Sequence, residues 1–134
     1  MLLLLAWPAY AASPVPPVPA PGTVRDWAEA YFERYAERSD WEGFLGQYAE
    51  QVSFEDPVAR IALDSRTLFG EFYFWPDPAF SKHPDYPRTL VVEELIVQGN
   101  RSIASGYFTP FQYLGVTFAE DEPMRFTMWL DWNE

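Results

Sequence analysis

The first half of the chain repeats apolar residues at helical spacing. One such series follows Thr23 and consists of Val24, Trp27, Ala28, Tyr31 and Tyr35. Because residues three and four positions apart share one face of a helix, the series predicts a helix that begins at Thr23. Asp26 stands three residues after Thr23, which is a short form of the capping box found at helix starts.

Two shorter helices are predicted after the first. Asp40 is a candidate N-cap, and the apolar face that follows it consists of Trp41, Phe44, Leu45 and Tyr48. Ser65 is a third candidate N-cap, and it precedes a helix over about residues 66–74. Aspartate and serine favour this position because their side-chain oxygens accept hydrogen bonds from the first free N–H groups of a helix.

Between the second and third helices, the hydrophobic period changes from helical spacing to two. Val52, Phe54 and Asp56 alternate with polar residues, which predicts a strand over about residues 51–55. The three side chains then share one face, and a carboxylate continues that apolar face at the end of the strand. Pro57 ends the strand because it lacks a backbone N–H group.

Three more strands are predicted in the second half of the chain, over residues 89–98, 102–109 and 124–132. Gly99-Asn100 is typical of a tight hairpin between the first two of them. Residues 76–87 contain four prolines and predict a surface loop. Helices followed by consecutive strands predict an α+β domain, with the helices packed on one side of a curved antiparallel sheet.

The N-terminal residues do not fit this domain pattern. Residues 1–11 are typical of a targeting segment, because a short apolar run leads to the small-x-small sequence Ala9-Tyr10-Ala11. No Lys or Arg precedes the leucines, so either the start lies further upstream or the segment is not a signal. We expect a periplasmic or secreted protein. Residues 12–22 hold five prolines and predict an extended linker, which leaves residues 23–134 as the folded domain.

Composition narrows the possible partners. Aromatic residues make up 19% of the 134 residues, which indicates a core or cavity lined with rings. The net charge is −11 and no Lys/Arg cluster is present, so neither nucleic acid nor an anionic membrane surface is expected as a partner. The leucine run is too short to span a bilayer. The acidity also disfavours acidic ligands unless a local arginine overrides it.

Cofactor and metal chemistry find little support in the sequence. The chain has no Cys and a single His, His83, which excludes thiolate chemistry and a multi-histidine metal site within one chain. His83 lies in the predicted 76–87 loop, and we assign it no catalytic role. No phosphate-binding loop or serine-nucleophile motif is present. We therefore predict no metal and no cofactor.

Two residues are candidates for chemistry, and each has a plainer interpretation. Asp56 lies at the end of an apolar face, which makes it a candidate general base. Asp-Pro is also ordinary turn chemistry at the end of a strand. Tyr31 faces inward on the first helix, either as a core tyrosine bonded to the backbone or as a donor that points into a cavity.

The local sequence resembles the nuclear transport factor 2-like superfamily, often called SnoaL-like, which includes the ketosteroid isomerases. The matching segments are Asp40-Trp41-Glu42-Gly43-Phe44, Tyr48-Ala49-Glu50, Phe54-Glu55-Asp56-Pro57-Val58 and Gly70-Glu71-Phe72-Tyr73. The resemblance implies a cystatin-like roll, in which three N-terminal helices and a curved sheet enclose a cone-shaped pocket. It also implies a homodimer, and one more strand after the last one predicted here.

In the ketosteroid isomerases, the position matching Asp56 holds the general base, and the position near Tyr31 holds a tyrosine that binds the oxyanion. The resemblance therefore implies proton abstraction by Asp56, with Tyr31 as the hydrogen-bond donor. The second oxyanion donor of those enzymes is a carboxylic acid, but Met128 stands at its position here. Isomerisation, dehydration and cyclisation by proton transfer are equally compatible with this pattern.

The resulting hypothesis is a pocket that binds a small hydrophobic molecule. The candidate walls are Phe54, Phe72, Tyr107, Met128 and Trp129. Met128 and Trp129 cannot both face inward on a regular strand, because neighbouring side chains point to opposite faces. The alternative is a non-catalytic accessory or interaction module, exported and carried on a proline-rich stalk.

Overall fold

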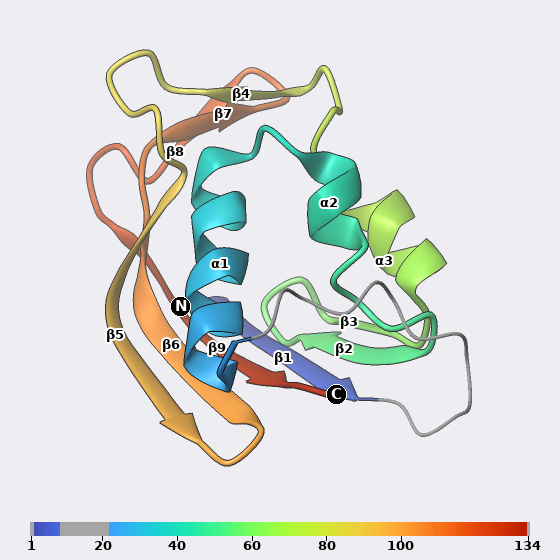
Figure 1. Ribbon diagram of the computed structural model, residues 1–134. Coiled ribbons are helices and arrows are strands. Elements are labelled where there is room, and N and C mark those ends of the chain that lie inside the picture. Colours follow the sequence, from blue (N-terminus) through green and yellow to red (C-terminus); the bar gives the residue numbers. More distant parts are fainter. Residues whose placement is uncertain (1, 9–21, 134) are drawn as a thin grey trace.

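The computed structural model describes residues 2–8 and 22–133 and has the predicted α+β class, with helices packed on largely antiparallel sheets (Figure 1). The helices are α1 (Val24–Glu37), α2 (Trp41–Leu45) and α3 (Arg66–Phe72). The strands are β1 (Leu2–Pro8), β2 (Val52–Asp56), β3 (Ile61–Leu63), β4 (Phe80–Lys82), β5 (Leu90–Gln98), β6 (Arg101–Phe108), β7 (Phe111–Tyr113), β8 (Val116–Phe118) and β9 (Met124–Asp131). Apart from Gly22, the predicted linker lies outside the described residues.

The helix starts are those that the sequence predicts. Thr23 and Asp26 form a reciprocal capping box at α1. The Asp40 carboxylate accepts a hydrogen bond from the Gly43 N–H at 2.9 Å, and the Ser65 hydroxyl accepts one from the Leu68 N–H at 3.3 Å. These side chains satisfy N–H groups that have no partner within the helix. Two helix ends differ from the prediction: α2 ends at Leu45, before Tyr48 of its predicted apolar face, and α3 ends at Phe72 instead of residue 74.

The large sheet has the strand order β3-β2-β1-β9-β6-β5. Its inner face carries Phe126, Met128 and Leu130 of β9, all of them buried. α1 lies across this face over β5 and β6, whereas α2 and α3 lie toward β2 and β3 (Figure 1). The core lies between the helices and the inner face. No helix in the described ranges is both long and apolar enough to cross a membrane.

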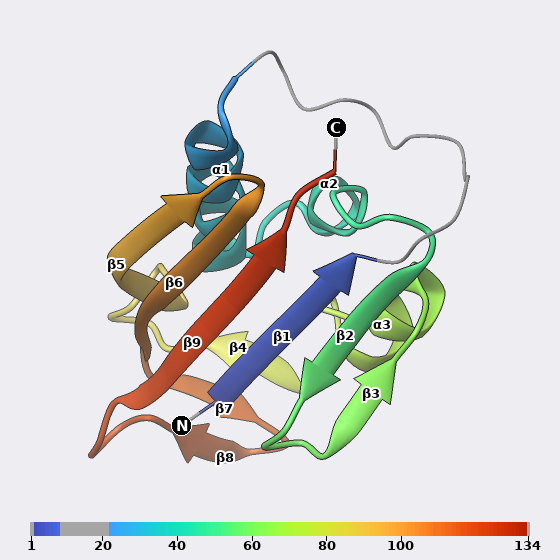
Figure 2. The same ribbon diagram turned by 90° about the horizontal axis from the view of Figure 1, so that it is seen from below.

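Residues 2–8 lie within the large sheet, although their sequence is typical of a targeting segment. β1 pairs antiparallel with β2 and parallel with β9, and it separates these two strands (Figure 2). β2 and β3 therefore connect to β9, β6 and β5 through β1. Whether the segment acts in targeting stays a prediction, but its backbone occupies a central position in this sheet.

A second, three-stranded sheet has the order β4-β7-β8. β4 lies within residues 76–87, for which the sequence predicts a loop alone. The three strands share a row of rings, in which Phe111 lies 5.7 Å from Phe80 and 5.2 Å from Phe118, centroid to centroid. Strands of three residues leave too short a pattern for alternation to reveal them.

Deletion of residues 2–8 should destabilise the domain. β2 and β9 would each be left with an unpaired edge of backbone donors and acceptors. At about 1 kcal/mol for each lost hydrogen bond, we expect the free energy of unfolding in urea to fall by on the order of several kcal/mol. A peptide with the sequence of residues 1–10 should restore part of it. Unchanged stability would mean that β2 and β9 pair directly without β1.

Gly106→Ala should also destabilise the sheet. The register of β5 against β6 shifts between Val92 and Glu94, and a Cβ atom on Gly106 would lie 1.9 Å from the Val91 carbonyl oxygen. The strands would have to separate, which should lower the free energy of unfolding by about 1–3 kcal/mol. A thermal melt measures this change. Ser105→Ala, on the outer face of the same strand, is the matched control and should have little effect. Equal melting temperatures for the two variants would contradict the close approach.

Candidate functional site

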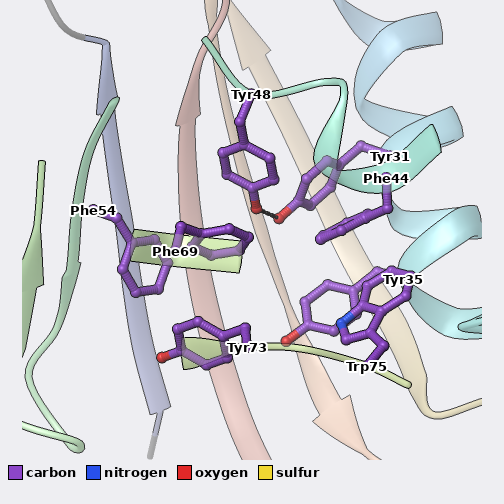
Figure 3. Close-up of a pocket in the computed structure, with 8 residues that line it drawn as sticks. All are labelled: Tyr31, Tyr35, Phe44, Tyr48, Phe54, Phe69, Tyr73 and Trp75. Atoms are coloured by element: carbon purple, nitrogen blue, oxygen red, sulfur yellow. Dashed lines mark hydrogen bonds between the residues drawn. The ribbon is translucent and has the colours of Figure 1, made fainter. Parts of the chain in front are cut away.

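Aromatic rings converge between the helices and β2. Eight residues line the small cavity there: Tyr31, Tyr35, Phe44, Tyr48, Phe54, Phe69, Tyr73 and Trp75 (Figure 3). The cavity volume is about 10 Å³, which is close to the minimum that holds one water molecule. The rings thus nearly fill this part of the interior, and the residues that the structure describes around this cavity do not enclose the wide conical pocket expected from the resemblance.

Two tyrosine hydroxyls meet at one end of the cavity. The Tyr31 and Tyr48 oxygens are 2.5 Å apart, and either can be the donor. α1 turns Tyr31 inward, and Tyr48 follows the end of α2 (Figure 3). One hydroxyl donates to the other, so one proton of the pair is left for a further acceptor. Tyr31 is therefore paired with another side chain and not with the backbone.

Burial keeps these hydroxyls protonated. It is the largest cause that raises the pKa values of Tyr31, Tyr35 and Tyr48 above the usual tyrosine range. Each of the three side chains is at most 6% exposed. A phenolate in such surroundings would lack solvation, so the tyrosines act as neutral hydrogen-bonding groups.

Asp56 is a buried carboxylate, only 2% exposed. Its Oδ1 atom accepts hydrogen bonds from the Val58 and Ala59 N–H groups, each at 2.9 Å. Its Oδ2 atom accepts one from the Tyr73 hydroxyl at 2.7 Å. Oδ1 thus makes the turn that Asp-Pro predicts, while Oδ2 contacts a residue that lines the cavity. The turn interpretation of Asp56 is confirmed at Oδ1, and its role as a general base stays a prediction.

Tyr73 contacts Asp56 and also lines the cavity. Figure 3 shows its hydroxyl on the side of the ring away from the Tyr31–Tyr48 pair. Burial, followed by the hydrogen bond donated to Asp56, raises the pKa of Tyr73. Asp56 itself does not line the cavity. In this arrangement Tyr73 separates the two residues, Asp56 and Tyr31, that the sequence suggests for catalysis.

The structure distributes the predicted pocket walls over several places. Phe54 lines the cavity, and Met128 is buried in the core without lining it. Phe72 is 52% exposed at the end of α3. Tyr107 and Trp129 lie on the outer face of the sheet, opposite the buried Phe108 and Met128 that neighbour them in sequence. Strand alternation thus corrects the prediction for Tyr107 and resolves the choice between Met128 and Trp129.

Sequence reasoning did not assign a site role to Tyr35, Tyr48, Tyr73 and Trp75. The sequence does contain a signal for Tyr35 and Tyr48, because each places a polar hydroxyl group on the predicted inward face of a helix. For Tyr73 and Trp75 the sequence shows only that rings gather at the end of the third helix, because the orientation of each ring depends on where α3 ends. Among the described residues, no group of three or more His, Cys, Asp or Glu could hold a metal ion. His83 lies in the loop, where its Nδ1 atom accepts a hydrogen bond from the Asp85 N–H.

Comparison with known proteins supports the fold. No family model matches the sequence, and no curated protein matches it. A similar solved structure is the crystal structure of a putative ketosteroid isomerase from Kribbella flavida, with 20% sequence identity and a TM-score of 0.50. The likeness covers 83% of this chain and 80% of that one. It shows a shared, coarse α+β fold of the ketosteroid isomerase-like type and does not identify a reaction.

The buried tyrosines predict a loss of stability in alkali. Unfolding returns the pKa values of Tyr31, Tyr35 and Tyr48 from their raised values to about 10. Below that pH both states keep these protons. Above it the unfolded chain loses protons that the folded chain keeps, so stability should fall with rising pH until the folded-state pKa values are passed. The expected slope is up to about 1.4 kcal/mol per pH unit for each tyrosine.

Tyrosinate absorbance measures this directly. The three buried tyrosines should ionise only as the protein unfolds, and Tyr35→Phe should reduce the alkaline slope. Tyr113→Phe is the control, because Tyr113 is 40% exposed and should not change the slope. Ionisation of all eight tyrosines near pH 10 in a folded protein would contradict the burial of the hydroxyls.

Proposed function

We propose that the chain binds a small apolar molecule at the aromatic site and transfers a proton with Asp56 as the general base. The observation that carries the proposal is a buried carboxylate, hydrogen-bonded to the Tyr73 hydroxyl at 2.7 Å, beside a ring-lined cavity. The ketosteroid isomerase-like fold agrees with small-molecule binding. The reaction class is abstraction of a proton next to a carbonyl group, as in an isomerase or a lyase.

The two oxygens of Asp56 would have different roles. Oδ1 is held by two backbone N–H groups, which fix the orientation of the carboxylate. Oδ2 is bonded to the hydroxyl of Tyr73, a side chain that can move without unfolding the turn. Displacement of Tyr73 would free a lone pair on Oδ2, and this is the atom that would take the proton.

The Tyr31–Tyr48 pair would stabilise the charge that develops on the substrate oxygen. Of the two hydroxyl protons, one lies in the 2.5 Å contact and the other is available to the substrate. A neutral donor in apolar surroundings is effective for this purpose, because it needs little reorganisation when the charge forms. Asp56 and the tyrosine pair would then act on opposite sides of the substrate.

Ligand binding would require the rings to move. A volume of about 10 Å³ holds no substrate, whereas ligand sites commonly enclose about 300–1,000 Å³. Tyr73 and Trp75 are the candidates for movement, because they follow the short helix α3 and flank Phe74, which is 48% exposed. Movement of this segment would enlarge the cavity and release Asp56 in the same step.

Deuterium exchange tests the proposal. Cyclohexanone in deuterated buffer should exchange its α-protons faster with the protein than without it, as followed by proton NMR. Asp56→Asn should remove the acceleration, since an amide cannot act as the base, and rates should fall by at least about a hundredfold. Asparagine can still accept the Val58 and Ala59 hydrogen bonds, so the turn should remain.

Glu55→Gln is the matched control for that variant. Glu55 neighbours Asp56 on β2 but is exposed on the opposite face. Its substitution should leave exchange unchanged. A folded Asp56→Asn protein that still accelerates exchange would exclude Asp56 as the base.

The close packing of the rings favours one alternative, a non-catalytic module with a solid aromatic core. In that case cyclohexanone would neither bind nor exchange, while Asp56→Asn would change only stability.

Export and self-association remain parts of the proposal. Exposed apolar side chains on the outer sheet face, Ile96 at 49% and Trp129 at 39%, support self-association through that face.

A further inference from the structure

Arg38 has no acidic partner in a chain rich in acids. The sequence holds 20 acidic and 9 basic residues. Six arginines lie within 4.0 Å of a carboxylate: Arg25, Arg34, Arg66, Arg88, Arg101 and Arg125. No such pair within the described part of the chain includes Arg38, and its buried Nε atom has no hydrogen-bond partner there. A buried donor without an acceptor is unfavourable, so an added acceptor would be stabilised here.

The Arg38 side chain is held by aromatic rings and not by a salt bridge. The guanidinium carbon lies 4.2 Å from the ring centroid of Phe80, 5.4 Å from that of Tyr35 and 5.5 Å from that of Trp75. The backbone of Arg38 is left-handed, with φ of 47°, at the end of α1. Glycine is the usual residue in this conformation, and other residues adopt it at a cost. The contacts with the rings offset that cost and fix the direction of the guanidinium.

This position is next to the cavity. Tyr35 and Trp75 contact the guanidinium and also line the cavity. Burial raises the pKa of Tyr35, and the positive charge of Arg38 acts against this rise. The Tyr35 hydroxyl points across the cavity toward Tyr73 (Figure 3). The site therefore has a cationic end at Arg38 and an anionic end at Asp56, with rings between them.

We propose that Arg38 is the anion-binding residue of this site and that its ligand is a small carboxylate with an apolar body. The inference rests on the proposed ligand site and names the class of its ligand. A guanidinium donates two parallel hydrogen bonds to a carboxylate. The rings of Tyr35 and Trp75 would contact the apolar body.

A phosphate fits the same position less well. A dianion would meet a single arginine in a protein of net charge −11, which disfavours its approach. The anionic group must also lie away from Asp56, because two carboxylates at one end would repel each other. A monocarboxylate with its charge at Arg38 and a neutral end toward Asp56 satisfies both conditions.

Phenylacetate and phenylacetamide form a probe pair that differs in charge and hardly in shape. The full-length protein is titrated with each, and the Arg38 Nε–H signal in proton–nitrogen NMR spectra is followed after assignment with Arg38→Lys. Phenylacetate should shift this signal and bind at least about tenfold more tightly than the amide, as expected for a hydrogen-bonded charge pair. Inorganic phosphate should bind more weakly than phenylacetate.

Arg38→Met removes the charge and keeps an apolar side chain among the rings. It should bring the affinities for the two probes to within about twofold of each other, since only the charged contact distinguishes them. Arg38→Gln serves the same purpose if the methionine variant does not fold. Arg34→Met is the matched control, because Arg34 lies one turn earlier in α1 and pairs with Asp40 at the surface. It should keep the preference for phenylacetate.

The outcomes separate this inference from the proposed function. Equal binding of acid and amide to the unmodified protein, or a preference that survives in Arg38→Met, overturns the anion site and leaves a ligand site. A preference that depends on Arg38, without deuterium exchange of cyclohexanone, supports the anion site and overturns proton transfer. No binding of either probe by folded protein overturns the anion site, while the deuterium exchange of cyclohexanone decides the proposed function separately.

Discussion

The packing of Phe44 is the interaction on which the arrangement of the helices depends. Its side chain is 1% exposed. Five rings surround it, with centroid distances of 4.9 Å to Tyr31, 5.3 Å to Tyr35, 6.2 Å to Trp41, 5.6 Å to Tyr48 and 4.0 Å to Trp75. These rings come from α1, from α2 and the turn after it, and from the segment after α3. α2 has only five residues and could not persist alone, so its place is set by this cluster.

The same cluster determines what the candidate site can do. Rings that fill the interior exclude water, which strengthens every hydrogen bond between the hydroxyls and carboxylate within it. They also leave no room for a ligand, so binding has to disrupt part of the packing. The segment after α3 is the place where this disruption costs least, because Tyr73 is half-buried and its neighbour Phe74 is exposed. Stability and ligand access thus depend on the same few rings.

Local sequence predicts the elements of this fold better than its assembly. Thr23, Asp40 and Ser65 mark the helix starts correctly, because a capping hydrogen bond involves residues only three positions apart. The inward direction of Tyr31 follows from helical spacing in the same way. Its partner Tyr48 does not, because that contact depends on how α2 is placed against α1. Residues 2–8 show the limit most clearly, since an apolar run without alternation fits a targeting segment and a central strand of a sheet equally well.

β1 links the two parts of the sheet that position the candidate site residues. Asp56 lies on β2, whereas α1 with its tyrosines packs on β5 and β6, and β1 is the strand that joins these two parts of the sheet. The aromatic cluster connects them a second time, through Phe54 and Phe69, whose rings are 5.0 Å apart, and Tyr48, 4.3 Å from Phe69. The distance between the carboxylate and the Tyr31–Tyr48 pair is therefore set by a backbone ladder and by ring packing together. Loss of either connection would change this separation, and the proposed proton transfer depends on the separation of the groups that carry it out.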